Sequence, residues 1–153
     1  MQKKITIIRN LEIIERELNS AASGVAALSV KKDAFVQFAT NFVYHDKNIF
    51  LFLSGTELIR SVRYDVIARF SIFKNIPPSK EEIDKDRIYQ LFSITVTGDL
   101  REVEEKKVIN EVTQSYIQKY SGKLIHGAKD PEPLGKLVLI DSNELIAFEE
   151  TGC

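Results

Sequence analysis

Between Gly24 and Lys74 the sequence alternates apolar runs with short polar turns, and no other feature restricts the fold as strongly. The first three apolar runs cover residues 25–30, 34–44 and 49–53. The turns between them are Lys31-Lys32-Asp33 and His45-Asp46-Lys47-Asn48. Asp and Asn suit tight turns, because their side chains bond the local backbone and tolerate left-handed geometry. These turns are too short to hold crossover helices, so the pattern predicts an antiparallel meander.

A short helix and another strand are predicted after the third run. The helix is expected over Thr56 to Arg63, with Ser54 or Thr56 as its N-cap. Residues 66–73 return to a strand pattern. The prolines at positions 77 and 78 cannot donate to a hydrogen-bond ladder, so the strand is expected to end before them.

Two longer helices and a second group of strands are predicted outside this block. Apolar residues recur at helical spacing from Thr6 to Asn19 and from Asp99 to Tyr120. Residues 88–98 alternate as a half-buried strand that ends at Gly98, and a hairpin is expected from 136–140 and 144–148 across residues 141–143. We therefore expect about seven strands and three helices in a single domain over residues 1–153, mainly β (α+β), which close most readily into a small barrel.

The order and spacing of residues 24–74 resemble the FMN-binding split barrel of the pyridoxamine 5'-phosphate oxidase-like superfamily. Two later stretches extend the resemblance over most of the chain, namely ITVTGDLREV at 94–103 and KLVLIDSNELIAFEE at 136–150. The resemblance implies an antiparallel split β-barrel with flanking helices. It also implies FMN in a cleft at the interface of a homodimer.

The resemblance also indicates which residues would hold the cofactor. Backbone groups of the second strand would meet the flavin ring, and hydroxyl, amide and basic groups after the third strand would hold the phosphate. The matching strand residues are Phe38, Ala39, Thr40 and Asn41, and the matching phosphate residues are Ser54, Gly55, Thr56, Arg60 and Arg63. A turn that exposes backbone N–H groups at a helix start is independently suited to an anion, and arginine can bind phosphate in bidentate fashion.

The phosphate region departs from the family pattern at two positions. Leu58 stands where a basic residue is common, and the neighbouring Glu57 would repel phosphate. Phosphate binding would then depend on Arg60, Arg63 and backbone groups. The function implied is an FMN-dependent oxidoreductase acting on a small organic substrate, and the alternative on the same fold is a cofactor-free binding barrel. No nucleophile–base pair is recognisable in the sequence.

A second alternative is a haem-binding protein of iron acquisition, since some split-barrel proteins bind haem. Haem needs an axial ligand, and His126 in the glycine-containing late loop is the candidate. His45 lies in a polar turn and is expected to be exposed. Two histidines and Cys153 cannot form a dedicated zinc site without carboxylates, so no metal site is expected.

Composition and charge restrict location and partners. A net charge of −1, from 21 basic and 22 acidic residues, gives no long-range field for nucleic acid or anionic lipid. No apolar run approaches the roughly 18 residues of a membrane helix, no secretory signal is visible, and the single cysteine indicates a reducing compartment. We therefore expect a cytoplasmic protein without nucleic-acid or membrane partners. Six strand aromatics exceed what one small barrel can hold, which favours a homodimer: Phe35, Phe38, Phe42, Tyr44, Phe50 and Phe52.

Overall fold

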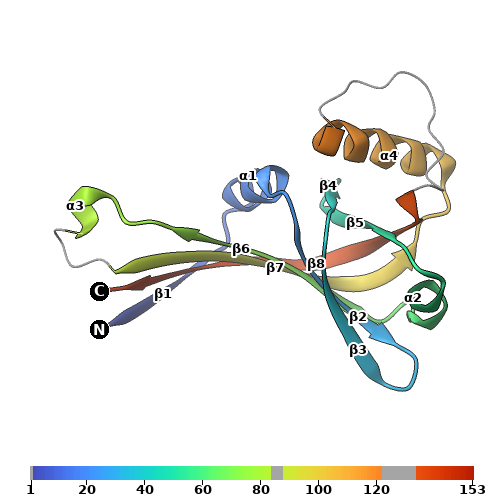
Figure 1. Cartoon of the computed structure of the whole chain (residues 1–153), viewed down its shortest axis with the longest axis horizontal. Coiled ribbons are helices and arrows are strands. Elements are labelled where there is room, and N and C mark those ends of the chain that lie inside the picture. Colours follow the sequence, from blue (N-terminus) through green and yellow to red (C-terminus); the bar gives the residue numbers. More distant parts are fainter. Residues whose placement is uncertain (1, 84–87, 122–133) are drawn as a thin grey trace.

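The computed structural model describes residues 2–83, 88–121 and 134–153, and within them it contains one eight-stranded sheet and four helices (Figure 1). The strands are β1 (Lys3–Ile8), β2 (Gly24–Val30), β3 (Ala34–Thr40), β4 (Val43–His45), β5 (Asn48–Leu53), β6 (Ile67–Ile76), β7 (Tyr89–Glu102) and β8 (Lys136–Gly152). The helices are α1 (Leu11–Ser20), α2 (Thr56–Ser61), α3 (Lys80–Ile83) and α4 (Lys106–Ser121). No described helix is long and apolar enough to cross a membrane.

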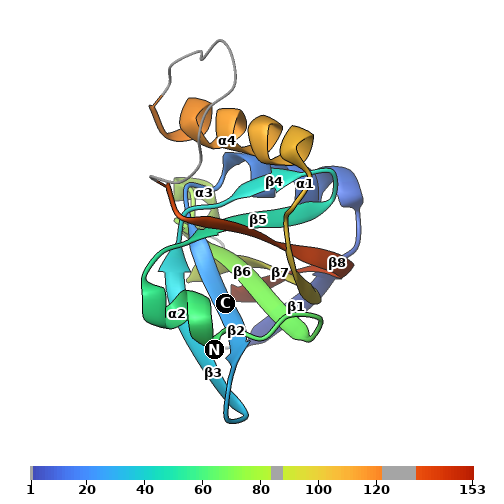
Figure 2. The same ribbon diagram turned by 90° about the vertical axis from the view of Figure 1, so that its right-hand side faces the viewer.

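The sheet is antiparallel throughout and has the strand order β3-β2-β6-β7-β8-β5-β4, with β1 added to β8. Its two end strands, β3 and β4, follow each other in the chain, so the sheet curls into a barrel that stays open between them. Figure 2 shows this curl, with α4 lying across β4 and β5 and α2 beside β2 and β3. The mainly β split barrel with flanking helices is confirmed. The simple meander is wrong in one respect, because β5 pairs with β8 and not with β3.

The long strands β6, β7 and β8 extend beyond the barrel as an arm, and β1 forms one edge of that arm (Figure 1). The two ends of the chain meet at its tip, where Gln2 and Cys153 exchange backbone hydrogen bonds of 2.8 and 3.0 Å. Helix α1 packs on one side of the arm, with Ile14 and Leu18 buried in the main core. The other side of the arm, here called its outer face, carries no helix in the described part of the chain.

Alternation of apolar residues explains how the barrel is filled. Phe92, Ile94 and Val96 of β7 all point into the core, as the sequence predicts. Phe42 and Phe70 are completely buried there, with ring centroids 4.5 Å apart. A second cluster lies under α4 and contains Val43, Phe50, Val112 and Leu137. The barrel and α4 together therefore take up most of the strand aromatics, and of the six named above only Phe35 is largely exposed, at 64%.

A break between β3 and β4 replaces the single strand expected over residues 34–44. The Tyr120 hydroxyl accepts the Phe42 N–H at 3.0 Å, and the Lys119 ammonium donates to the Phe42 carbonyl at 3.0 Å. The Asn41 amide donates to the Tyr116 hydroxyl at 3.3 Å. Because α4 supplies these partners, the backbone can turn here without leaving buried polar groups unpaired.

The helix expected from Thr6 to Asn19 is wrong in its first third. Residues 3–8 form β1, which pairs with β8 over its whole length, and α1 begins only at Leu11. Asn10 is the N-cap, and its side chain accepts the Ile13 N–H at 3.2 Å. The apolar residues before Leu11 matched a helical spacing by chance. Residues 3–8 are rich in β-branched side chains, a composition that suits a strand at a sheet edge.

The predicted strand end at Gly98 and the predicted final hairpin are also wrong. β7 runs through Gly98 to Glu102, α4 starts at Lys106, and residues 136–152 form one strand. The register shifts beside Gly98, since Thr97 pairs with Glu144 while Gly98 pairs with Ser142, which leaves Asn143 as a bulge. Two boundaries differ slightly from the prediction: α2 ends at Ser61, and β6 continues to Ile76. A short helix that was not predicted, α3, follows the prolines.

Candidate functional site

Helix α2 closes one end of the barrel and begins at an open turn. Gly55 precedes it with φ 90°, and no atom lies within 4 Å of the position a Cβ would take there. Ser54, Gly55 and Thr56 are all exposed. The predicted N-cap, Ser54 or Thr56, is wrong, because Gly55 holds that position without a side-chain cap bond. The turn therefore leaves room for a ligand beside the start of α2.

A shallow cleft of about 510 Å³ lies at this helix and is lined by Lys31, Thr56, Glu57, Arg60 and Ser61. Lys31 comes from the β2–β3 turn, which is attached to α2 through the Lys31 N–H and the Ser61 carbonyl at 2.8 Å. In the described part of the chain, the side chains of Lys31 and Arg60 take part in no ion pair. The described lining therefore contains two cationic residues and the hydroxyl residues Thr56 and Ser61, against the single carboxylate of Glu57.

The other residues predicted around α2 have different surroundings. Arg63 lies beyond the helix and is paired with Asp33, with 3.3 Å between Nη1 and Oδ1. Leu58 packs against the barrel core together with Ile59. An apolar residue at position 58 thus closes the barrel end, and Lys31 supplies a cation to the cleft from the neighbouring turn.

The strand residues predicted to meet the flavin ring lie at the opposite end of the β2–β3 hairpin. Thr40 pairs with Gly24, whereas Ala34 pairs with Val30 beside α2, a separation of about 20 Å at the usual rise per residue. Ala39 is exposed. Thr40 donates to the Asn41 carbonyl at 3.0 Å. One protomer therefore does not bring the two predicted groups into a single cleft, and only an extended ligand lying along the hairpin could touch both.

A hollow of about 210 Å³ lies between these two groups. Its lining includes Ala27, Phe35, Gln37 and Arg69 on the outer side of the sheet. Because Ala27 pairs with Gln37 in the middle of the hairpin, this hollow lies on the path from the α2 cleft to Ala39. An aromatic ring, an amide and a guanidinium are together suited to contact a flat heterocycle with polar edges.

Comparison with known proteins identifies the fold. No protein-family model matches the sequence, and no curated protein sequence matches it. Solved structures do match. A proposed 5-nitroimidazole antibiotic resistance protein from Bacteroides thetaiotaomicron has a TM-score of 0.73 at 11% identity, covering 99% of this chain and 90% of the other. A proposed pyridoxamine 5'-phosphate oxidase from Corynebacterium glutamicum has a TM-score of 0.60 at 18% identity, covering 95% and 98%. This chain has the pyridoxamine 5'-phosphate oxidase-like split-barrel fold.

A third matching split barrel is the FAD- and haem-binding protein from Mycobacterium smegmatis. Its TM-score is 0.59 at 13% identity, and the match covers 93% of this chain and 71% of the other. Structures of this fold thus include proteins that bind flavin and proteins that bind haem. At these identities the similarity establishes the fold, and the site of this split barrel has to be argued from its own residues.

His45 does not line the α2 cleft. It is the last residue of β4, with its Nε2 3.6 Å from a carboxylate oxygen of Glu111 on α4. His126, the candidate haem ligand, lies outside the described residues. Among the residues that are described, no three His, Cys, Asp or Glu side chains gather as they would around a metal ion.

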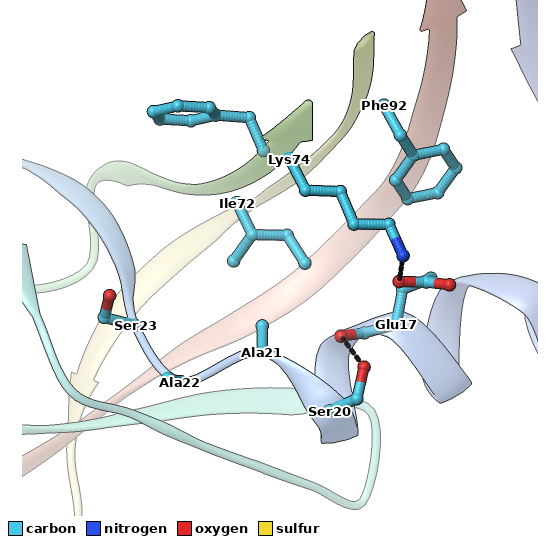
Figure 3. A pocket seen from close by; sticks show the side chains of 9 residues that line it. Glu17, Ser20, Ala21, Ala22, Ser23, Ile72, Lys74 and Phe92 are labelled. Atoms are coloured by element: carbon cyan, nitrogen blue, oxygen red, sulfur yellow. Dashed lines mark hydrogen bonds and ion pairs between the residues drawn. The ribbon is translucent and has the colours of Figure 1, made fainter. Parts of the chain in front are cut away.

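A further hollow, of about 300 Å³, lies between the end of α1 and β6, with Ser20, Ala21, Ala22, Ile72 and Phe92 in its lining (Figure 3). Lys74 and Glu17 also line it, and they pair with each other at 2.6 Å. Because Lys74 and Glu17 balance each other, the described lining of this hollow offers no unpaired charge to a ligand. The α2 cleft, with two cations that lack an ion-pair partner in the described chain, is the better candidate site.

Proposed function

We propose that this split barrel binds FMN and acts as a flavin-dependent oxidoreductase on a small organic substrate. The observation that carries the proposal is the α2 cleft, whose lining includes Lys31, Arg60 and Thr56. Flavin-binding proteins among the matching structures support it. A bound flavin would supply electron or hydride transfer, and the chain would bind and orient it.

The residues at the cleft fit a phosphate group. An ammonium and a guanidinium form charge-assisted hydrogen bonds with phosphate oxygens, and a hydroxyl can donate one more. Glu57 opposes this attraction, so the two cations leave a net charge of one in the cleft. Lys31, Thr56 and Arg60 would hold the phosphate, with Ser54 and Gly55 offering turn N–H groups and Arg63 staying on Asp33. The ring would lie along the hairpin toward Ala39, Thr40 and Asn41.

Arg60→Ala and Lys31→Ala are each expected to weaken FMN binding about ten- to a hundredfold. Each removes one charge-assisted bond to the phosphate, which is worth roughly 1.5–3 kcal/mol. Riboflavin lacks the phosphate and should bind wild type and variants equally. Lys32→Ala, which removes an exposed lysine from the same turn, is the matched control and should change neither affinity. Titration by flavin fluorescence gives the affinities. Equal losses for FMN and riboflavin would contradict the assignment.

The colour of the purified protein separates the flavin proposal from its alternatives. A yellow protein that releases flavin on denaturation would support FMN binding, whereas a Soret band would indicate haem. A colourless protein that binds neither cofactor would favour the cofactor-free barrel. The observed geometry favours flavin, since the cationic cleft does not depend on His126.

A homodimer formed through the outer face of the arm is part of this proposal. Strand register places Phe73, Ser93, Phe148 and Ile7 in one row across that face. Phe73 is 67% exposed and Ile7 is 53% exposed. Exposed Phe73 and Ile7, with half-buried Phe148 between them, on a sheet face that no described helix covers are typical of a surface that packs against a partner. A second copy, related by a two-fold axis, would meet the same row with its own.

Phe73→Glu is expected to convert the dimer into a monomer at micromolar concentration. A two-fold interface loses the buried aromatic twice, at about 1.5–3 kcal/mol each, so the dimer dissociation constant should rise about a hundredfold or more. Light scattering measures the mass. Leu11→Glu, on α1 at the other side of the arm, is the control and should leave the mass unchanged. A monomeric wild type would contradict the proposal.

A further inference from the structure

Lys119 of α4 is a half-buried cation without an ionic partner in the described chain. Its Nζ lies 3.8 Å from the ring centroid of Phe42 and donates to the Phe42 carbonyl at 3.0 Å. It also lies 5.2 Å from the Tyr120 ring centroid. These contacts position the ammonium but do not neutralise it. Burial lowers the pKa of Lys119 to about 8, as expected for a cation that has lost water without gaining a carboxylate.

The side chain borders an open cleft of about 510 Å³ between α1, β4 and α4. Its other lining residues are uncharged, namely Asn19, Val43, Tyr44, Ser115 and Gln118. Two of the three carboxylates of α1 have other partners, and the third, Glu12, does not line the cleft. Glu15 accepts a hydrogen bond from the Tyr44 hydroxyl at 3.0 Å, and Glu17 pairs with Lys74 at 2.6 Å. The cleft is therefore a polar space with one positive group and no negative group in its described lining.

We propose that this cleft binds a small organic monocarboxylate, with Lys119 as its counter-ion. One ammonium balances one negative charge, which favours a carboxylate over a phosphate dianion. Asn19, Ser115 and Gln118 supply neutral side-chain hydrogen-bond donors for the remaining oxygen valences. Val43 and the Tyr44 ring offer apolar surface to the organic part of the ligand. This site lies between α1, β4 and α4 and shares no lining residue with the α2 cleft, so it does not depend on flavin binding.

The affinity of this cleft for a carboxylate should fall as the pH rises through the lowered pKa of Lys119. A lysine with an ordinary pKa would stay charged over the same range. Among the residues that the structure describes, the titratable groups around Lys119 are Tyr116 and Tyr120 on α4, Tyr44 on β4 and, behind it, Glu15 on α1. Burial raises the pKa of Tyr44 and of Tyr120, so both phenols stay neutral while Lys119 titrates. A bound carboxylate favours the ammonium and raises the pKa of Lys119. Affinity is therefore highest below pH 8 and falls by up to about tenfold per unit above it.

Titration calorimetry with benzoate, and with benzamide as its uncharged analogue, tests the site. Benzoate is expected to bind with uptake of a proton that approaches one per ligand about one pH unit above the pKa of Lys119, as measured in buffers of different ionisation heat. Lys119→Gln should weaken benzoate about ten- to a hundredfold, and Lys119→Arg should retain binding but abolish proton uptake. Lys107→Gln, on an exposed part of the same helix, is the control and should change nothing.

Several results would overturn the proposal. They are benzamide binding as tightly as benzoate, inorganic phosphate binding more tightly than benzoate, and unchanged benzoate affinity in Lys119→Gln. Failure of the wild-type protein to bind benzoate or acetate at millimolar concentration would overturn it as well. None of these results bears on FMN binding, because the flavin titration tests Lys31 and Arg60 in the α2 cleft, on the other side of the barrel.

Discussion

Phe70→Ala is expected to lower the free energy of unfolding by about 3–5 kcal/mol, an effect large enough to threaten a domain of this size. Phe70 is completely buried, and its ring packs on Phe42 with centroids 4.5 Å apart. The ring also lies against the backbone of Gly24, where a Cβ would approach Phe70 to 2.2 Å. Alanine would leave a cavity that strand backbone and α4 cannot readily fill.

Urea unfolding followed by circular dichroism measures this loss. Phe70→Leu should cost less, because it keeps part of the buried volume. Phe35→Ala is the matched control, since Phe35 is 64% exposed and its removal should leave stability within about 0.5 kcal/mol. A cost below about 1 kcal/mol for Phe70→Ala would show that the two rings do not form the centre of the core.

Gly98→Ala is expected to destabilise the protein by about 3 kcal/mol, although it adds a single methyl group. A Cβ at this position would lie 2.0 Å from the Asp141 carbonyl oxygen and 2.6 Å from its carbonyl carbon. These are backbone atoms of β8, so the strand itself would have to move at the Asn143 bulge. Thr97→Ala, one residue earlier, should cost at most about 1 kcal/mol.

Thermal unfolding of Gly98→Ala and Thr97→Ala in parallel provides the comparison. Equal melting temperatures would mean that β7 and β8 separate at the bulge more easily than the register indicates. If Gly98→Ala melts at the lower temperature, as expected, glycine is needed here for the close approach of β7 and β8, and not for ending a strand.

Local patterns predicted the parts of the fold whose partners lie nearby in sequence. The alternation of Phe92, Ile94 and Val96 gave the correct buried face, and the Lys31-Lys32-Asp33 turn gave the β2–β3 hairpin. The same patterns failed where a distant segment decides the structure. Residues 3–8 form a strand because β8 lies beside them, and the break after Thr40 exists because α4 binds Phe42.

The candidate site divides in the same way. The resemblance predicted Thr56 and Arg60 as phosphate residues, and the structure places both in the lining of the α2 cleft. Lys31 carried no signal, since only the contact between the β2–β3 turn and α2 reveals it. The resemblance also predicted Arg63 as a phosphate residue, but its side chain pairs with Asp33 and does not line the cleft. Lys119 was equally hidden, because its cleft exists only once α1, β4 and α4 have come together.

The placement of β8 also has a consequence for how the chain folds. Among the described strands β1 comes first in the sequence and pairs only with the last one, β8, which also pairs with β5 and β7. During synthesis, β1 therefore leaves the ribosome long before its partner exists. The β2–β3 and β6–β7 pairs can form as local units, but the barrel stays open until the final segment arrives. Closing such distant pairs carries the entropic cost of a long loop, so we expect slow folding, with the backbone of β1 unpaired until β8 is in place.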